Sequence, residues 1–242
     1  MRVRVVVSYD GTDYCGFQRQ ANAPTVQGAL EAALEQVTQQ EIRILAAGRT
    51  DAGVHAEGQI IAFDTSWRHG LDVLKRALNA VLPRDVAVRT VTSAAAEFHP
   101  RFDACSRRYR YTLYNAPVRN PFTRRYSLHV VDELDLAAMQ EAAGLLIGEH
   151  DFGAFGQPPQ GNNTVRSVRA AECSRQGPFV FFDVEANAFL YRMVRSIVGT
   201  LLEVGRSKLD PEAFCDILES CDRSQAGPTL LPHGLCLIEV KY

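Results

Sequence analysis

The segment GRTDAGVHA, residues 48–56, connects two apolar runs and holds a single acid, Asp51, among glycines. The apolar runs, 42–47 and 59–65, have the composition of β-strands, so Asp51 is expected on the loop that joins them. A carboxylate presented on such a loop is a candidate for chemistry. The alternative is an Asx-turn, in which the side chain of Asp51 only accepts a hydrogen bond from its own backbone.

The chain around this loop predicts a compact unit of alternating strands and helices. Four further elements are expected over residues 2–9 (strand), 25–37 (helix), 71–81 (helix) and 86–91 (strand). Thr25 is a suitable N-cap for the first helix, and Pro83 ends the second. The order β-α-β-β-α-β is that of a ferredoxin-like unit, in which one antiparallel sheet lies under two helices.

The same order of elements is expected a second time after the alanine run at 94–96. Its members are predicted at 108–114 (strand), 136–147 (helix), 165–173 (strand), 179–186 (strand), 190–203 (helix) and 235–242 (strand). An additional helix should begin after Asp210, an N-cap followed by Pro211. The sequence therefore predicts an α+β protein of two ferredoxin-like halves, 1–104 and 105–242. The halves are expected to join through their antiparallel sheets, with an active-site cleft between them.

Composition is that of an ordinary globular protein. The 242 residues are 46% hydrophobic and 22% charged, and no run is apolar enough to span a bilayer. The N-terminus alternates as a strand does, without a signal-peptide pattern, so a cytoplasmic location is predicted. The six cysteines form no C-x-x-C pair, which indicates reduced thiols, mostly in the core, and neither a zinc site nor a disulfide framework.

Positive charge is concentrated in one segment although the net charge of the chain is only −2. Between His99 and Tyr126 a single acid, Asp103, is accompanied by seven arginines: 101, 107, 108, 110, 119, 124 and 125. The planar guanidinium of arginine suits phosphate and stacks on bases. This segment is therefore a candidate for binding RNA.

Cations and aromatic residues alternate within the strand segment RRYRY, residues 107–111. Because side chains on a strand alternate between its faces, Tyr109 and Tyr111 share one face, while Arg108 and Arg110 share the other. Tyrosines on strands are usually packing residues. Beside arginines, however, they also form the platforms on which single-stranded RNA bases stack.

Two further segments have alternative interpretations. Arg195 flanks the buried stripe of the helix predicted at 190–203, so it either extends its guanidinium to water or pairs with an acid. The segment 9–12, YDGT, resembles the acidic turn of haloacid-dehalogenase-type phosphatases. Ser8 stands where those enzymes need a nucleophilic aspartate, which makes phosphoryl transfer a poor reading.

Taken together, the chain resembles the TruA family of tRNA pseudouridine synthases nearly from end to end. The resemblance rests on motifs that occur in the family's order: 9–12 (YDGT), 16–20 (GFQRQ), 25–27 (TVQ), 30–34 (LEAAL), 48–56 (GRTDAGVHA), 101–102 (RF), 108–111 (RYRY), 150–152 (HDF), 187–195 (NAFLYRMVR) and 226–230 (AGPTL). The segment 156–163, GQPPQGNN, departs from the family pattern. No substrate contact is carried over to it.

The resemblance implies an isomerase that converts uridine to pseudouridine at positions 38, 39 and 40 of the anticodon stem-loop of tRNA, without metal or organic cofactor. Asp51 would be the nucleophile, or would help to remove the C2′ proton of the sugar. Tyr109 would stack on the uracil and take the proton from C5. Arg195 would be the cation that favours the ionised carboxylate.

The resemblance also implies a set of substrate-binding residues drawn from both halves: Arg19, Arg49, His55, Arg107, Arg108, Arg110 and Leu235. Arg49 would occupy the space left by the flipped uridine, and Leu235 would form an apolar wall against the base. The arginines of 99–126 would contact phosphates. The implied partners are tRNA and a second copy of the chain, with one tRNA reaching across both subunits. The alternative function is a non-catalytic RNA-binding protein or tRNA chaperone.

Overall fold

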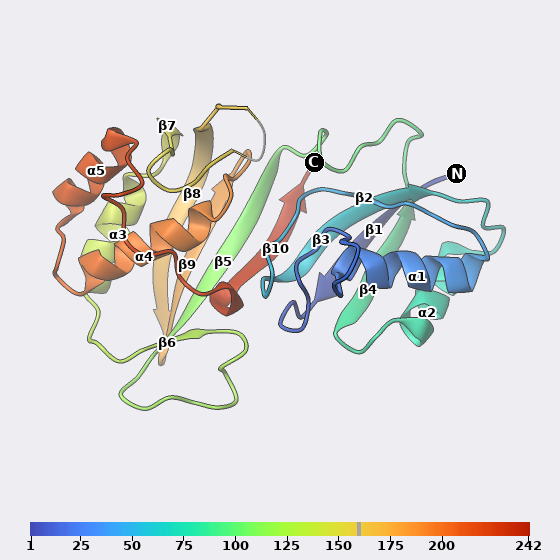
Figure 1. Ribbon diagram of the computed structural model, residues 1–242, viewed down its shortest axis with the longest axis horizontal. Coiled ribbons are helices and arrows are strands. Elements are labelled where there is room, and N and C mark those ends of the chain that lie inside the picture. The colour runs from blue at the N-terminus through green and yellow to red at the C-terminus, as the bar shows by residue number, and fades with distance from the viewer. Residues whose placement is uncertain (159–160) are drawn as a thin grey trace. The chain divides into compact units, whose positions relative to one another are not determined.

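The computed structural model describes residues 1–158 and 161–242 (Figure 1). Pro159 and Gln160, which belong to the segment 156–163, lie outside the described residues. The protein is α+β with mostly antiparallel strand pairing, which confirms the predicted fold class. It divides into two compact units, Met1–Cys105 with Cys236–Tyr242, and Ser106–Leu235.

The first unit contains the β-α-β-β-α-β order that the sequence predicted. Its elements are β1 (Arg2–Tyr9), α1 (Val26–Thr38), β2 (Leu45–Ala46), β3 (His55–Asp64), α2 (Leu71–Val81) and β4 (Val86–Ser93). Strand β1 lies between β4 and β3 and pairs antiparallel with both, while β2 pairs with β3. The last strand, β10 (Leu235–Lys241), runs parallel to β3 with Cys236 opposite His55. The sequence assigned this strand to the second half, whereas its pairing with β3 places Cys236–Tyr242 in the first unit.

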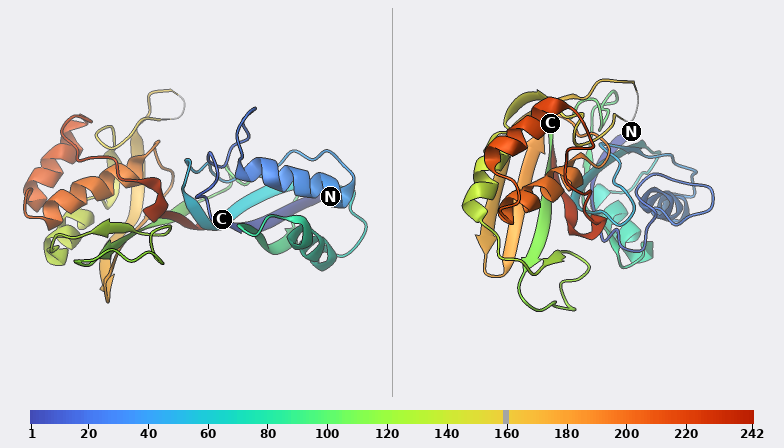
Figure 2. Two further views of the ribbon diagram at one scale, coloured as in Figure 1. Left: turned by 60° about the horizontal axis from the view of Figure 1, so that its bottom comes forward. Right: turned by 60° about the vertical axis from the view of Figure 1, so that its left-hand side comes forward.

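The core of the first unit follows from period-two and helical patterns. Every second residue of β1 is buried, from Val3 to Tyr9. Helix α1 begins behind Thr25, whose hydroxyl accepts the N–H of Gly28 at 3.2 Å, and it buries Leu30 among other residues. Helix α2 contacts both α1 and β4, as further views show (Figure 2).

The second unit is a sheet covered by three helices. Its elements are β5 (Ser106–Asn115), β6 (Leu128–Val130), α3 (Leu136–Gly144), β7 (Gly148–Asp151), β8 (Val165–Gln176), β9 (Phe179–Ala186), α4 (Met193–Gly205), α5 (Pro211–Ser220) and a 3-10 turn (Pro232–Gly234). The sheet order is β5-β9-β8-β7, and β6 runs parallel to β5. Helix α3 contacts β8, α4 contacts β5, and α5 contacts β7. Within the described ranges, no helix is long and apolar enough to cross a membrane.

Several predicted boundaries are wrong for identifiable reasons. The strand predicted at 42–47 shrinks to β2 because the N–H of Ile44 donates to the carboxylate of Glu31 at 3.3 Å and not to a neighbouring strand. The helix predicted from 190 begins at Met193 because Arg192 has a left-handed backbone with φ of 62°. Strands β6 and β7 were not predicted. Both are short, so their sequences carry little periodicity.

All six cysteines are free thiols, but the expectation that most lie in the core is wrong. Only Cys173 is buried, on β8. Cys15, Cys105 and Cys221 are exposed. The residues around a cysteine show no sequence pattern that separates a buried thiol from one on a loop.

We expect alkylation to distinguish these thiols. Burial raises the pKa of the Cys173 thiol to about 12, so the reactive thiolate is scarce there until the solution is strongly alkaline. Iodoacetamide at about pH 8.5 should modify Cys15 and Cys105 in the folded protein and leave Cys173 intact. Peptide mass mapping measures this. Modification of Cys173 as fast as in the unfolded chain would contradict the burial.

Candidate active site

The loop that carries Asp51 joins β2 to β3 and is held by the chain that follows β1. The hydroxyls of Thr50 and Tyr9 share a hydrogen bond of 2.8 Å, and both residues are buried. The N–H of Phe17 donates to the carbonyl of Thr50 at 3.0 Å. The backbone position of half-buried Asp51 is therefore fixed through its neighbour.

The turn after β1 packs directly against the same loop. A Cβ atom on Gly11 would lie 2.0 Å from the carbonyl oxygen of Val54, so only glycine fits at this position. Val54 in turn donates its N–H to the carbonyl of Asp51 at 3.1 Å. The YDGT motif and the GRTDAGVHA motif therefore pack against each other.

His55 lies inside this support, with 5% of its surface exposed at the start of β3. Its Nδ1 accepts the N–H of Gly11 at 3.0 Å and lies 3.2 Å from Oδ1 of Asp10. That same oxygen accepts the N–H of Thr12 at 2.9 Å. The acid of the YDGT turn therefore stabilises the turn, and the N–H of Gly11 in the same turn holds His55. The phosphatase comparison has no structural support.

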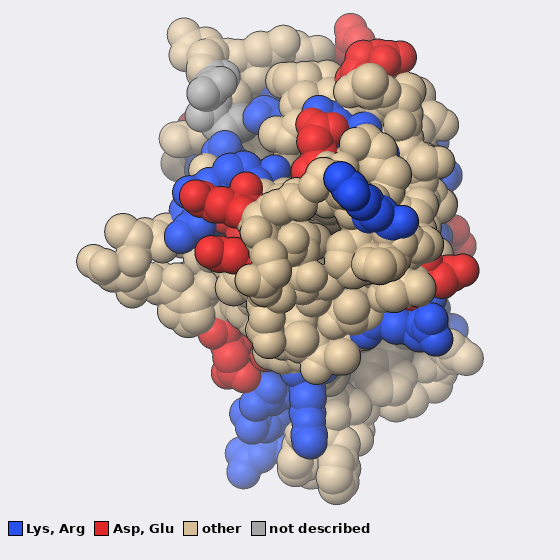
Figure 3. Space-filling view, turned by 90° about the vertical axis from the view of Figure 1, so that its right-hand side faces the viewer, with Lys and Arg blue, Asp and Glu red and all other residues tan. Residues whose placement is uncertain are grey.

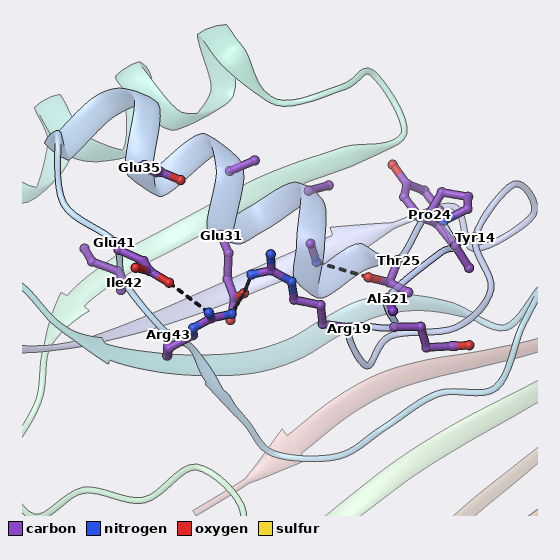
Figure 4. A pocket seen from close by; sticks show the side chains of 15 residues that line it. Tyr14, Arg19, Ala21, Pro24, Thr25, Glu31, Glu35, Glu41, Ile42 and Arg43 are labelled. Atoms are coloured by element: carbon purple, nitrogen blue, oxygen red, sulfur yellow. Dashed lines mark hydrogen bonds and ion pairs between the residues drawn. The ribbon is translucent and has the colours of Figure 1, made fainter.

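Arg49 and Arg19, two predicted substrate residues, have different surroundings. Arg49 is exposed beside Asp51. The guanidinium of Arg19 pairs with Glu31 at 3.0 Å, on the wall of a groove of about 520 Å³ along α1 (Figure 4). Glu35 and Glu41 also line this groove, so its acids outnumber its cations. The groove is poorly suited to phosphate.

Glu31 organises that wall from a position that is only 5% exposed. Its carboxylate accepts hydrogen bonds from Arg19, from Arg43 at 3.2 Å, from Gln27 at 2.9 Å and from the buried N–H of Ile44. The four donors come from α1, from the segment before it and from residues 43–44, which lead into β2. One buried carboxylate therefore ties the loop's supports to the helix.

Replacing Glu31 with alanine is expected to lower the free energy of unfolding by about 1–3 kcal/mol, because it leaves the N–H of Ile44 buried without its acceptor. Urea unfolding measures the change. Glu35→Ala is the matched control, since Glu35 is exposed one turn further along α1 and should change stability by less than about 0.5 kcal/mol. Equal effects of the two substitutions would argue against the role of Glu31.

In the second unit, Tyr109 and Tyr111 share one face of β5, in keeping with strand alternation. The ring of Tyr109 is half-buried and meets Phe189 edge-on, with centroids 5.0 Å apart and an interplanar angle of 80°. Tyr111 is fully buried and donates its hydroxyl to the carbonyl of Leu231 at 2.7 Å. Burial raises the pKa of Tyr111 far above its usual range, partly opposed by the charge of Arg195. Tyr111 is thus a packing residue, and Tyr109 keeps an accessible surface.

Two arginines of β5, Arg107 and Arg110, are held by partners within the second unit. Arg110 forms a forked ion pair with Asp183 at 2.9–3.1 Å and lies over the ring of Phe181. Arg107 donates to the carbonyl of Asn187 at 2.7 Å. Arg108, on the same face as Arg110, is half-buried. Fixed guanidinium groups lose less entropy when they bind an anion than freely rotating ones do.

Arg195 is anchored at the start of α4 and is not a surface arginine extended to water. Its Nε donates to the carbonyl of Leu230 at 2.7 Å, and the N–H of Leu230 donates back to the carbonyl of Arg195 at 3.2 Å. Leu235, the predicted apolar wall, is 7% exposed at the start of β10. Tyr111 and Arg195 therefore both meet the backbone at Leu230 and Leu231, on the β5 face that carries Tyr109.

Sequence reasoning missed the residues that hold these side chains: Tyr9, Gly11, Phe189 and Leu230. Each belongs to a motif that the sequence displayed, yet no local pattern assigns it a partner far along the chain. Among residues 1–158 and 161–242, no group of three or more His, Cys, Asp or Glu side chains could hold a metal ion.

Comparison with known proteins identifies the family of the chain. A family model described as tRNA pseudouridine synthase matches residues 5–103 and 142–242. The tRNA pseudouridine synthase A of Moorella thermoacetica is 48% identical over 245 residues, covering 99% of both chains. The enzymes of the same name from Brevibacillus brevis and Geotalea uraniireducens are 46% and 43% identical, each covering 100% of this chain and 99% of its relative. The chain belongs to the tRNA pseudouridine synthase family.

Proposed function

We propose that this protein isomerises uridine to pseudouridine at positions 38, 39 and 40 of the anticodon stem-loop of tRNA, in the cytoplasm. Membership of the family makes it an isomerase that acts on tRNA. The observation that supports Asp51 as the reacting acid is the support of its loop. A buried Tyr9–Thr50 hydrogen bond and the close contact of Gly11 with Val54 hold the backbone on either side of Asp51.

The reaction breaks the N1–C1′ bond of uridine, turns the uracil and joins C5 to the same sugar carbon. The proton on C5 must leave, and N1 gains one, so atoms balance without a co-reactant. We assign Asp51 as the nucleophile at C1′, with removal of the C2′ proton as the alternative first step. A nucleophile gains most from being held near its target, which is the role of the loop contacts.

The remaining site residues have distinct proposed roles. Tyr109 stacks on the uracil and receives the C5 proton, and the edge-on contact with Phe189 sets its ring orientation. Arg195 is assigned as the catalytic cation, and its hydrogen bond to the carbonyl of Leu230 holds its guanidinium in place. Arg49 fills the space left when the uridine flips out, which its exposure allows, and Leu235 packs against the base.

Phosphate binding is assigned to the arginines of 99–126, and Arg19 is kept among the substrate-binding residues without a phosphate role. Arg101, Arg119, Arg124 and Arg125 are exposed, as a phosphate contact requires. The face drawn in Figure 3 carries basic and acidic side chains in small groups of both signs and no large patch of one sign. We place His55 among the residues that hold the loop for substrate.

The acting form is proposed to be a homodimer, which light scattering of the purified protein tests.

Release of tritium from tRNA labelled at uracil C5 tests the proposal, because joining C5 to C1′ removes that hydrogen. The substrates are tRNAs with uridine at 38, 39 or 40, each compared with a version in which that uridine is replaced by cytidine. Release that depends on these uridines is expected. Binding of tRNA without release would instead identify a non-catalytic RNA-binding protein.

A further inference from the structure

The loop between β5 and β6, residues 116–127, exposes three large apolar side chains. It projects away from the sheet, below the β6 label in Figure 1 and at the bottom of the right-hand view of Figure 2. Phe122 is 92% exposed, Val118 73% and Tyr126 52%. An aromatic ring left so completely in water is a candidate for a contact with another molecule.

The backbone holds Phe122 at the tip of a defined turn. The side-chain oxygen of Asn120 accepts the N–H of Phe122 at 3.0 Å. The carbonyl of Asn120 accepts the N–H of Thr123 at 3.2 Å, and the hydroxyl of Ser127 donates to the carbonyl of Thr123 at 2.9 Å. The ring is therefore presented on an ordered turn, so binding costs little conformational entropy.

The charge around this ring has one sign. The loop carries Arg119, Arg124 and Arg125, all exposed, and no Asp or Glu occurs anywhere from residue 104 to residue 131. Such a segment attracts an anionic partner. Two copies of the loop meeting across a two-fold axis would instead bring like charges together, which disfavours a second copy of the chain as the occupant.

A pocket of about 370 Å³ opens at the base of the loop, within the usual size range of ligand sites. Arg119 and Arg124 line it together with the rings of Tyr114 and His129. His129 Nε2 lies 2.8 Å from the carbonyl of Ala116, and since a carbonyl can only accept, Nε2 carries the hydrogen. The pocket thus has a fixed ring wall and two guanidinium groups.

We propose that the loop 116–127 binds an unpaired nucleotide of tRNA outside the reacting uridine, with Phe122 stacked on the base and Arg119 and Arg124 on the adjoining phosphate at the pocket. The inference rests on the proposed function for its choice of tRNA as partner. Stacking on an exposed ring beside cations is how proteins hold unpaired bases, and a base within a helix presents no free face.

Affinity for full-length tRNA tests the loop. Phe122→Ala should raise Kd about 10-fold, and Arg124→Gln should raise Kd and reduce by about one the slope of log K against log salt. The rate at saturating tRNA should not change in Phe122→Ala. Ile147→Ala and Arg76→Gln are matched controls, because both side chains are exposed on other elements, and both should bind as the unmodified protein does.

Stacking has its own readout, since Trp67 is the only tryptophan. In a Trp67→Phe background, the indole emission of Phe122→Trp should be quenched by one equivalent of tRNA and not by a fully paired RNA duplex. An unchanged Kd for Phe122→Ala would overturn the proposal. So would indole emission that changes with protein concentration while light scattering shows loss of a dimer, because the ring would then lie between two copies of the chain. A protein that binds tRNA through this loop but releases no tritium would contradict only the proposed function, and the role of the loop would stand.

Discussion

Asp51→Asn is expected to lower the rate of pseudouridine formation by at least about 10,000-fold while leaving tRNA affinity within about threefold of the original. Asparagine has the shape of the carboxylate but cannot attack C1′ or accept a proton from C2′. The supports of the loop, the Tyr9–Thr50 hydrogen bond and the Gly11–Val54 contact, do not involve the side chain that changes. Single-turnover tritium release measures the rate, and fluorescence anisotropy measures affinity.

The matched control is Asp72→Asn, which removes an exposed carboxylate from α2 in the same unit and should leave the rate unchanged. An Asp51→Asn protein that keeps more than about a hundredth of the activity would show that this carboxylate is not the nucleophile. If affinity and rate fell together, the acid would be binding substrate and not reacting with it.

Gly199→Ala is expected to lower the free energy of unfolding by about 2–3 kcal/mol, and the melting temperature by several degrees. Gly199 lies inside α4, where alanine would ordinarily stabilise a helix by about 1 kcal/mol. Here the new Cβ would lie 1.8 Å from the carbonyl oxygen of Pro228, so the crossing backbone must move. Calorimetry and urea unfolding measure the change.

Gly144→Ala is the matched control, because Gly144 is also helical and its Cβ would meet no atom within 4 Å. It should leave stability unchanged or increase it. The displaced segment continues to Leu230, whose carbonyl accepts from Arg195, so Gly199→Ala should also reduce the turnover rate in the fraction that remains folded. Equal stability of the two variants would contradict the close contact.

Much of the fold could be predicted because its signals are local. Alternation in β1 and the capping residues Thr25 and Asp210 appear within a few residues of the elements they specify, and all three are confirmed. The errors occur where a distant group decides. The N–H of Ile44 donates to the carboxylate of Glu31 and not to a neighbouring strand, and only the folded chain brings those two residues together.

The candidate site divides in the same way. Asp51, Tyr109 and Arg195 belong to motifs that the sequence displays, and their roles in the reaction stay predictions. The packing of Gly11 on Val54 could not be predicted, although both lie in recognised motifs, because a glycine in a turn looks the same whether or not another backbone passes over it. The same holds for Gly199 under Pro228.

By itself, the sequence determined the α+β class, the order of elements in the first unit and the family, because periodicity, capping and ordered motifs are properties of the chain read along its length. Only the tertiary structure decided which groups each functional side chain contacts. His55 accepts a hydrogen bond from Gly11 beside the loop, Arg195 donates to the carbonyl of Leu230, and Phe122 is exposed to solvent. The physical reason is that burial and hydrogen-bond partners depend on residues that meet only after the chain has folded.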